Sequence, residues 1–274
     1  MDGDSWENYL ENNFKVMGKL NIIIVGHNEE KNLPKLFKSL EYFEGKVDLN
    51  IIYCDQESTD DSVKIAKEYW VAIHEHPKYW ICETSRIRTV NEDVKKWEWI
   101  LFLDADEELT NNFVCETKKI IDNDEYDTCI VPINIYFMKM RSQTSLQPRM
   151  FKKWAVELHD VAHHWYTLKS DKKIKMKNKV LNIDLKCQWC EITSYLEKLN
   201  RYTDNEVEKI ESMSKIKLFY GMFIKPIIWF FWFWLSRWYF FKGKSWWILA
   251  YYNSAYEFFK WAKVYEKLYI SHVK

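Results

Sequence analysis

Three short apolar segments most constrain the fold of this 274-residue chain. Residues 21–25, 49–54 and 99–103 are rich in Ile, Leu, Val and aromatic residues, as is typical of buried strands. A further short strand is expected near 71–74. Helical spacing of apolar residues predicts three helices. The first covers 29–40, the second begins after a cap at Ser58 or Asp60, and the third covers 85–96. This alternation predicts a mainly parallel sheet with helices on both faces.

Each strong strand is followed by a cluster of polar residues. The clusters occupy positions 26–29, 55–58 and 104–108. Ligands of open α/β sheets bind beyond the carboxyl ends of the strands. We therefore expect the three clusters to meet on one edge of the sheet, where a binding site would form.

The third cluster contains the pair Asp104-x-Asp106. Two carboxylates at this spacing can converge on one cation in a turn, and hard oxygen ligands suit Mg²⁺ or Mn²⁺. A metal held there would bind a diphosphate and neutralise its charge as it leaves. The alternative is a solvated strand end, with Glu107 and Glu108 complementing the dipole of a helix over 110–122.

The segments IIIVGHNEE, IIYCDQESTDDS and WILFLDADEEL, in this order and spacing, resemble the family 2 glycosyltransferases with the GT-A fold. The resemblance implies a Rossmann-like, mainly parallel sheet and a nucleotide-sugar donor. It places Asp55 against the uracil and Glu29 beside the nucleoside. It also places Asp104 at the ribose and the metal, and makes Asp106 the principal ligand of Mg²⁺ or Mn²⁺.

Longer segments resemble a bacterial subgroup that includes lipopolysaccharide-core β-glucosyltransferases. They are RTVNEDVKKWEWILFLDADEEL, QPRMFKKWAVELHDVAH and YLEKLNRYTDNEVEK. The resemblance implies that Arg88 pairs with phosphate, that Arg149 helps to hold the diphosphate, and that Asp160 is the catalytic base. His159 would touch the metal or the diphosphate. The alternatives are surface ion pairs for the two arginines and an ordinary loop carboxylate for Asp160.

Two positions depart from the family pattern. Glu57 stands where the family usually has a glycine, so the backbone there must avoid positive φ or accept strain. The subgroup often has a histidine just before the LNRYT helix, whereas residues 186–190 read KCQWC here. If that histidine normally helps to bind metal, the metal shell of this chain is incomplete.

The chain is expected to divide into a GT-A catalytic domain and a helical C-terminal region. The expected catalytic domain covers 1–192, with a nucleotide-binding half over 20–109 and an acceptor half over 110–192. Within the second half, extended segments over 128–140 and 143–151 are expected to form an antiparallel addition to the sheet. The helical region covers 193–274 and begins with a polar-faced helix over 193–214.

The C-terminal region differs sharply from the rest of the chain in composition. Residues 215–274 hold 23 of the 48 aromatic residues and ten Lys/Arg against two Asp/Glu, which leaves 30 basic and 38 acidic residues elsewhere. The apolar run 226–235 is shorter than the ~20 residues that span a bilayer. We expect helices over 216–242 and 244–270 that lie in an anionic membrane interface. The alternatives are a helical pair packed on the catalytic domain and a seam for homo-oligomerisation.

The resemblance implies an inverting, metal-dependent hexosyltransferase that moves a hexose, by resemblance glucose, from a UDP-sugar to a lipid-linked or lipopolysaccharide-type glycan. An acidic, polar N-terminus without a secretory signal favours a cytoplasmic protein, peripheral on the inner face of the cell membrane. Zero net charge gives no reason to expect nucleic acid. Two alternatives stay open: a nucleotidyltransferase, although VGHNEEKNL is not a Gly/Arg/Lys-rich phosphate loop, and a non-catalytic scaffold.

Overall fold

The polypeptide is divided into two compact units, Met1–Trp189 and Cys190–Lys274. The computed structural model describes residues 18–79, 82–137, 140–159, 165–182, 192–208, 210–236 and 244–270.

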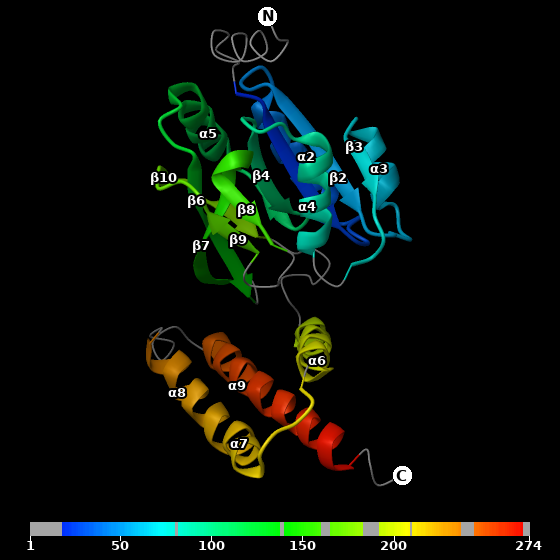
Figure 1. Cartoon of the computed structure of the whole chain (residues 1–274), viewed down its shortest axis with the longest axis vertical. Coiled ribbons are helices and arrows are strands. Elements are labelled where there is room, and N and C mark those ends of the chain that lie inside the picture. Colours follow the sequence, from blue (N-terminus) through cyan, green and yellow to red (C-terminus); the bar gives the residue numbers. More distant parts are fainter. Residues whose placement is uncertain are drawn as a thin grey trace, which may run out of the picture. The chain divides into compact units, whose positions relative to one another are not determined.

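The first unit is built on a parallel core of strands (Figure 1). These strands are β1 (Leu20–Gly26), β2 (Leu49–Asp55), β3 (Ala72–Glu75) and β4 (Trp99–Asp104). They lie side by side in the order β3-β2-β1-β4, all parallel. The predicted parallel sheet is therefore confirmed, and the strand order reverses between β1 and β4, where open α/β sheets bind their ligands.

The sheet continues beyond β4 in mixed orientation. Its further strands are β5 (Glu107–Glu108), β6 (Thr128–Phe137), β7 (Met140–Lys152), β10 (Lys173–Lys175) and β11 (Val180–Asn182). Strand β7 runs antiparallel to both β4 and β6, which confirms the expected antiparallel addition. A separate pair, β8 (Val156–Leu158) and β9 (Tyr166–Leu168), is also antiparallel.

Helices cover both faces of the sheet (Figure 1). They are α2 (Leu33–Leu40), α3 (Ser62–Glu68), α4 (Cys82–Asp93) and α5 (Asn111–Asn123), with short 3-10 turns η1 (Glu41–Phe43) and η2 (Lys153–Ala155). Side chains alternate along each strand and so divide the core in two. Ile22 and Ile24 pack with α2, α3 and α5, whereas Ile23 and Val25 pack with α4.

Strand register aligns the carboxyl ends of the central strands. Gly26 is paired with Asp55 across β1 and β2, and Val25 is paired with Asp104 across β1 and β4. The residues that follow these positions are the three polar clusters of the sequence. The predicted convergence on one edge of the sheet follows directly from this register.

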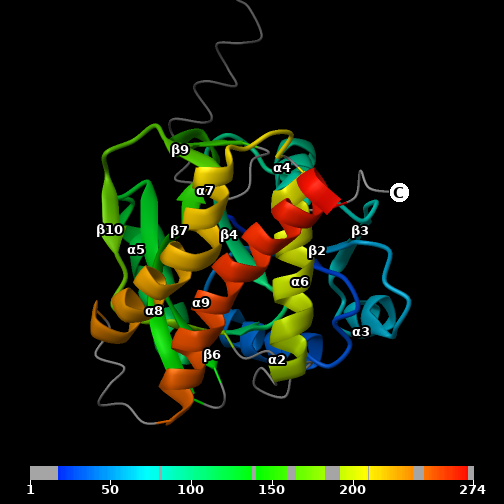
Figure 2. The same ribbon diagram turned by 90° about the horizontal axis from the view of Figure 1, so that it is seen from below.

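The second unit is helical (Figure 2). It contains α6 (Ile192–Glu208), α7 (Lys215–Phe219), a π-helical turn η3 (Tyr220–Ile224), α8 (Lys225–Ser236), α9 (Lys244–Tyr265) and a second π-helical turn η5 (Glu266–Ile270). Helix α9 packs against both α6 and the α7–α8 path. Gly221 permits the close approach, because a Cβ there would lie 2.4 Å from the Trp261 ring.

The α7–η3–α8 path changes one expectation from the sequence. Among the described residues, one helix, Lys215–Leu235, is long and apolar enough to cross a membrane by length and composition, and 17% of its most apolar window is buried. The run 226–235 alone was too short to span a bilayer, whereas the helix expected from residue 216 begins at Lys215 and reaches the length of a span.

Candidate functional site

The face of the sheet covered by α4 carries a partly buried network of charged groups at its carboxyl edge. Ile100 and Phe102 of β4 pack under α4, and alternation puts Asp104 on the same face. Strand β7 pairs Met150 with Leu101, and Phe151 packs under α4, so Arg149 emerges on this face beside the end of β4. The network therefore arises from three separate elements of the fold.

The arginine–carboxylate network consists of Arg86, Asp104, Glu107 and Arg149. One Asp104 oxygen accepts a hydrogen bond from Arg86, and the other accepts one from Arg149 at 2.8 Å. Arg149 also lies 3.6 Å from Glu107, and its Nε donates to Gln147. Within the described residues, Nε of Arg86 and Nη1 of Arg149 are buried without a hydrogen-bond acceptor. An anionic group that reached these N–H groups would satisfy them.

Arg88, the phosphate-binding candidate from the resemblance, is not brought to this network. Its side chain is 49% exposed and its Nε donates to Glu92 at 3.0 Å. Arg86, two residues earlier, is buried and occupies the place beside Asp104. A helix turns about 100° per residue, so Arg86 shares the inward stripe with Val90, whereas Arg88 points away. The spacing of Arg86 to Val90 was the sequence signal that could have identified it.

Asp104 is held ionised by its two arginines. Burial works against the charge, but the guanidinium groups of Arg149 and Arg86 hold the pKa of Asp104 well below its ordinary value. The carboxylates raise the pKa of Arg149 in turn, although burial opposes them. The result is a fixed pair of positive groups around one negative group.

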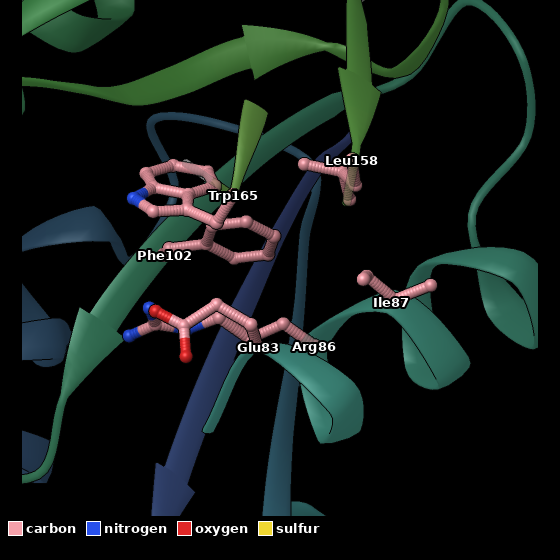
Figure 3. Close-up of a pocket in the computed structure, with 6 residues that line it drawn as sticks. All are labelled: Glu83, Arg86, Ile87, Phe102, Leu158 and Trp165. Atoms are coloured by element: carbon pink, nitrogen blue, oxygen red, sulfur yellow. The ribbon is translucent and has the colours of Figure 1, made fainter. Parts of the chain in front are cut away.

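Aromatic side chains fix the position of Arg86 (Figure 3). Its guanidinium carbon lies 5.0 Å from the centroid of the Phe102 ring, within the range of a cation–π contact. The Trp165 ring lies 5.8 Å from Phe102 and completes a shallow hollow that Glu83 also lines. Arg86 is thus prepositioned by packing as well as by charge.

Glu107 departs from its expected place at the start of a helix. It lies in β5, where it is paired with Asn182 of β11, and helix α5 begins only at Asn111, capped by the Thr110 hydroxyl. Glu107 accepts the backbone N–H of Asp104. Burial, with the nearby carboxylates of Asp104 and Asp106, raises the pKa of Glu107 to about 8 despite Arg149. Its partner strand is distant in sequence, so no local pattern marks it.

The candidate nucleoside-binding acids Glu29 and Asp55 lie at the ends of β1 and β2. One Asp55 oxygen accepts the Ser58 N–H, and the other is buried without a partner among the described residues. Glu29 accepts a hydrogen bond from the Asn32 amide. Burial raises the pKa of Tyr53, and the nearby carboxylates of Asp55 and Glu29 add to this effect.

The two loops that follow β1 and β2 contain strained backbone. Asn28 and Glu57 both have positive φ, at 56° and 58°. The departure at Glu57 is thus accommodated by strain, since non-glycine residues disfavour this region. Asn28 is stabilised there because its N–H donates to the Ser58 hydroxyl and its side-chain oxygen accepts the Thr59 N–H. These bonds lock the loops together at the sheet edge.

Asp106 follows β4 and is half-buried. Asp104 and Asp106 supply the hard oxygen donors that Mg²⁺ or Mn²⁺ prefers, so the donor set fits the metal implied by the resemblance. Both oxygens of Asp104 already accept arginine hydrogen bonds. Asp106 stays the principal metal-ligand candidate that the resemblance gives, with Asp104 in support.

The remaining candidates come from the loop after β8. His159 donates its backbone N–H to Trp165, and its Nε2 lies 2.8 Å from the Thr167 hydroxyl. Its ring is therefore engaged with β9. Asp160 lies outside the described residues, as do residues 186–190.

The strand order and the charged edge define an α/β protein with a GT-A-like fold. A model of the family described as glycosyl transferase family 2 matches residues 21–201. The chain belongs to glycosyl transferase family 2.

Relatives and solved structures agree with this family. A Rickettsia felis protein named as an uncharacterized glycosyltransferase is 29% identical over 136 residues, 49% of this chain and 44% of that protein. The chain thus matches less than half of the length of this relative. A Rickettsia typhi protein of the same description is 24% identical over 227 residues, 78% of this chain and 75% of that protein.

The crystal structure of S. aureus TarS, residues 1–349, is similar to this fold, with a TM-score of 0.50 and 14% identity. The similarity covers 91% of this chain and 90% of that structure. At this identity the similarity concerns the fold alone.

Proposed function

We propose that the chain is an inverting, metal-dependent hexosyltransferase. It would transfer a hexose, with glucose as the first candidate, from a UDP-sugar to a lipid-linked or lipopolysaccharide-type glycan at a membrane. The observation that most supports this proposal is the arginine–carboxylate network beside Asp106, at the point where the strand order of the sheet reverses. Family membership supports sugar transfer, and the subgroup resemblance supports the donor and the acceptor.

The donor half of the site follows from the charges. Glu29 and Asp55 would contact the nucleoside at the ends of β1 and β2. Arg86 and Arg149 would bind the diphosphate, because their unpaired N–H groups suit phosphate oxygens and their positions are fixed by Asp104. Arg86 takes the role that the resemblance assigned to Arg88. Both guanidiniums would stabilise the charge that develops on the leaving diphosphate.

The metal would be held by Asp106 with Asp104 in support, and would supply charge neutralisation for the diphosphate. His159 stays a candidate for contact with either the metal or the diphosphate. The protein itself positions the acidic residues, because the register of β1, β2 and β4 places the ends of these strands on one edge of the sheet.

The acceptor half of the reaction needs a base. Asp160 is the candidate, by resemblance, to take the proton of the acceptor hydroxyl. The acceptor oxygen would then form a bond to the anomeric carbon as the bond to the diphosphate oxygen breaks, in one in-line displacement that inverts configuration. No covalent intermediate with the protein is required.

The proposal is tested by a nucleotide-release assay over a panel of nucleotide sugars, with Mn²⁺, with Mg²⁺ and with a chelator. We expect release of UDP from a UDP-hexose, dependent on metal. Release of pyrophosphate from a nucleoside triphosphate and a sugar phosphate would instead indicate a nucleotidyltransferase. Absence of turnover, with retained binding of nucleotide, would support the scaffold alternative.

Asp160→Asn is expected to lower kcat about 100-fold, within the range that general-base catalysis contributes, with little change in donor binding. The substitution keeps the shape of the side chain but removes its basicity. Turnover is measured with acceptor, and donor binding by calorimetry. Asp171→Asn, an exposed change of the same kind, serves as the control. Near-normal turnover by Asp160→Asn would remove this residue as the base.

The membrane part of the proposal is supported by an exposed apolar stripe along the α7–η3–α8 path. Exposed apolar side chains recur every three or four residues, from Ile216, which is 84% exposed, to Leu235. The intervening members are Phe219, Tyr220, Phe223, Ile224, Ile227, Ile228, Phe231 and Trp232. Such a face suits the apolar side of a membrane interface, with Lys215 and Lys217 at its start.

The full-length protein is expected to sediment with anionic vesicles at low salt and much less with neutral vesicles. Lys215→Gln with Lys217→Gln should weaken this binding about 30-fold, because each basic residue near an anionic surface contributes about 1 kcal/mol. Both lysines are exposed. The matched control is Lys64→Gln with Lys67→Gln on α3, which changes the net charge equally. Equal binding to neutral and anionic vesicles would contradict the electrostatic part of the proposal.

A further inference from the structure

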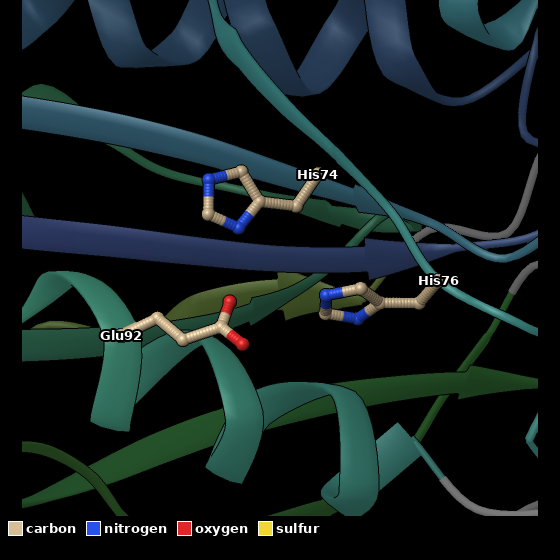
Figure 4. Close-up of side chains that lie close together, drawn as sticks. All are labelled: His74, His76 and Glu92. Atoms are coloured by element: carbon tan, nitrogen blue, oxygen red, sulfur yellow. The ribbon is translucent and has the colours of Figure 1, made fainter.

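Two histidines and a glutamate lie together away from the arginine–carboxylate network (Figure 4). Potential ligand atoms of His74, His76 and Glu92 all lie within 4.8 Å of one another. His74 belongs to β3, His76 follows it directly, and Glu92 reaches toward both rings from α4. The cluster therefore bridges an edge strand and the helix that carries Arg86.

Strand geometry explains why the two histidines share one face. Side chains two apart on an extended chain point the same way, and Ile73, which precedes His74, packs into the core on the α2–α3 side of the sheet. His74 and His76 consequently face α4. The backbone N–H of His76 donates to the Asp55 carbonyl at 2.8 Å, which continues the alignment beyond β3. The arrangement is fixed by the sheet and not by a free loop.

The chemistry of the cluster suits a transition metal. His76 is 4% exposed, and its Nδ1 is buried without a hydrogen-bond partner among the described residues. A buried ring nitrogen of this kind suits a metal, which binds the neutral imidazole. Asp93 lies 3.5 Å from Nδ1 of His74, as in the carboxylate–histidine pairs that orient metal-binding rings.

We propose that His74, His76 and Glu92 form a second metal site, for Zn²⁺, separate from the Asp104-x-Asp106 pair. Two imidazoles and a carboxylate, with water as the fourth ligand, are a ligand set that Zn²⁺ accepts. Tetrahedral coordination at Zn–N distances near 2.1 Å brings ligand atoms to about 3.4 Å apart, so modest side-chain rotations close the site. Mg²⁺ does not favour imidazole, which distinguishes the two sites.

Arg88 is the competitor for this site. Its Nε donates to one oxygen of Glu92, so Arg88 competes with a metal for this carboxylate. Both side chains are 49% exposed, so the pair is weak. With the metal bound, β3 is clamped to α4. Because Arg86 lies on the inward face of the same helix, the clamp would hold the helix that positions this residue.

The test uses the full-length Asp106→Asn protein, so that the aspartate pair contributes little. We expect Co²⁺ to give the intense visible absorption of a four-coordinate site, and Zn²⁺ to displace it. His74→Gln and Glu92→Gln, added separately, should each weaken Zn²⁺ binding at least about 100-fold by calorimetry. Both side chains are partly exposed, and circular dichroism checks that the fold is kept.

Two further variants make the result specific. Arg88→Gln should tighten Zn²⁺ binding about five-fold, because it removes the cation that competes for Glu92. Glu68→Gln, an exposed acid on α3, should leave it unchanged. An unchanged Kd on adding His74→Gln, or no Zn²⁺ binding by the Asp106→Asn protein, would overturn the proposal.

Discussion

Asp106→Asn is expected to lower kcat for sugar transfer about 1000-fold. Removal of the charged metal ligand loses several kcal/mol of stabilisation of the leaving diphosphate, and about 4 kcal/mol corresponds to this factor. Asp104 cannot compensate, because each of its oxygens already accepts a hydrogen bond from an arginine. Turnover is measured as UDP release at saturating donor, over a range of Mn²⁺ concentrations.

Two controls separate loss of metal from loss of fold. Asp106 is half-buried at the end of β4, so thermal unfolding of Asp106→Asn should stay close to that of the wild type. Asp171→Asn should keep full activity, since Asp171 is exposed and remote in sequence from the edge clusters. If Asp106→Asn retains more than about a tenth of wild-type turnover, and the same metal dependence, Asp106 is not the principal metal ligand.

Local pattern was sufficient for the parallel half of the fold. The runs at 21–25, 49–54 and 99–103 became β1, β2 and β4 because each is apolar and is followed by polar residues that end the strand. Parallel pairing of strands with similar lengths then aligns their carboxyl ends without further information. The convergence of the acidic clusters could therefore be predicted from the sequence.

Non-local pairing accounts for what the sequence did not reveal. Arg149 reaches Asp104 because β7 pairs with β4 across about fifty residues, and Glu107 is buried because β11 pairs with β5. Arg86 is a different case, since helical periodicity with Val90 does mark it as inward. The resemblance to the bacterial subgroup favoured Arg88 instead, although this residue lies on the outer side of α4.

Arg86 and Arg88 lie on the same helix, α4, and substituting them gives the second large expected effect, a difference in stability. Arg86→Met should lower the free energy of unfolding by about 3 kcal/mol, near the lower end of the range for breaking a buried ion pair. Arg86 is 4% exposed, but Asp104 is 37% exposed, so solvent partly screens the loss. Arg88→Met should leave stability nearly unchanged, because its ion pair with Glu92 is exposed. Urea denaturation of the full chain measures both.

The pH dependence of stability tests independently whether Asp104 is the partner of Arg86. The pKa of Asp104 is depressed in the folded state, so its ion pairs contribute stability above the ordinary carboxyl pKa of about 3.9. That contribution is lost as the pH falls through the lower folded value. The stability difference between wild type and Arg86→Met should therefore narrow below about pH 4.

Binding of the donor nucleotide then distinguishes a structural role of Arg86 from a functional one. Arg86→Lys keeps a positive charge beside Asp104 but loses the forked geometry that suits phosphate, so it should recover part of the stability and little of the affinity for UDP. Arg88→Met should bind UDP like the wild type, because its side chain points away from the network. If Arg88→Met loses UDP affinity while Arg86→Lys keeps it, the phosphate contact belongs to Arg88, and the network around Asp104 serves the fold alone.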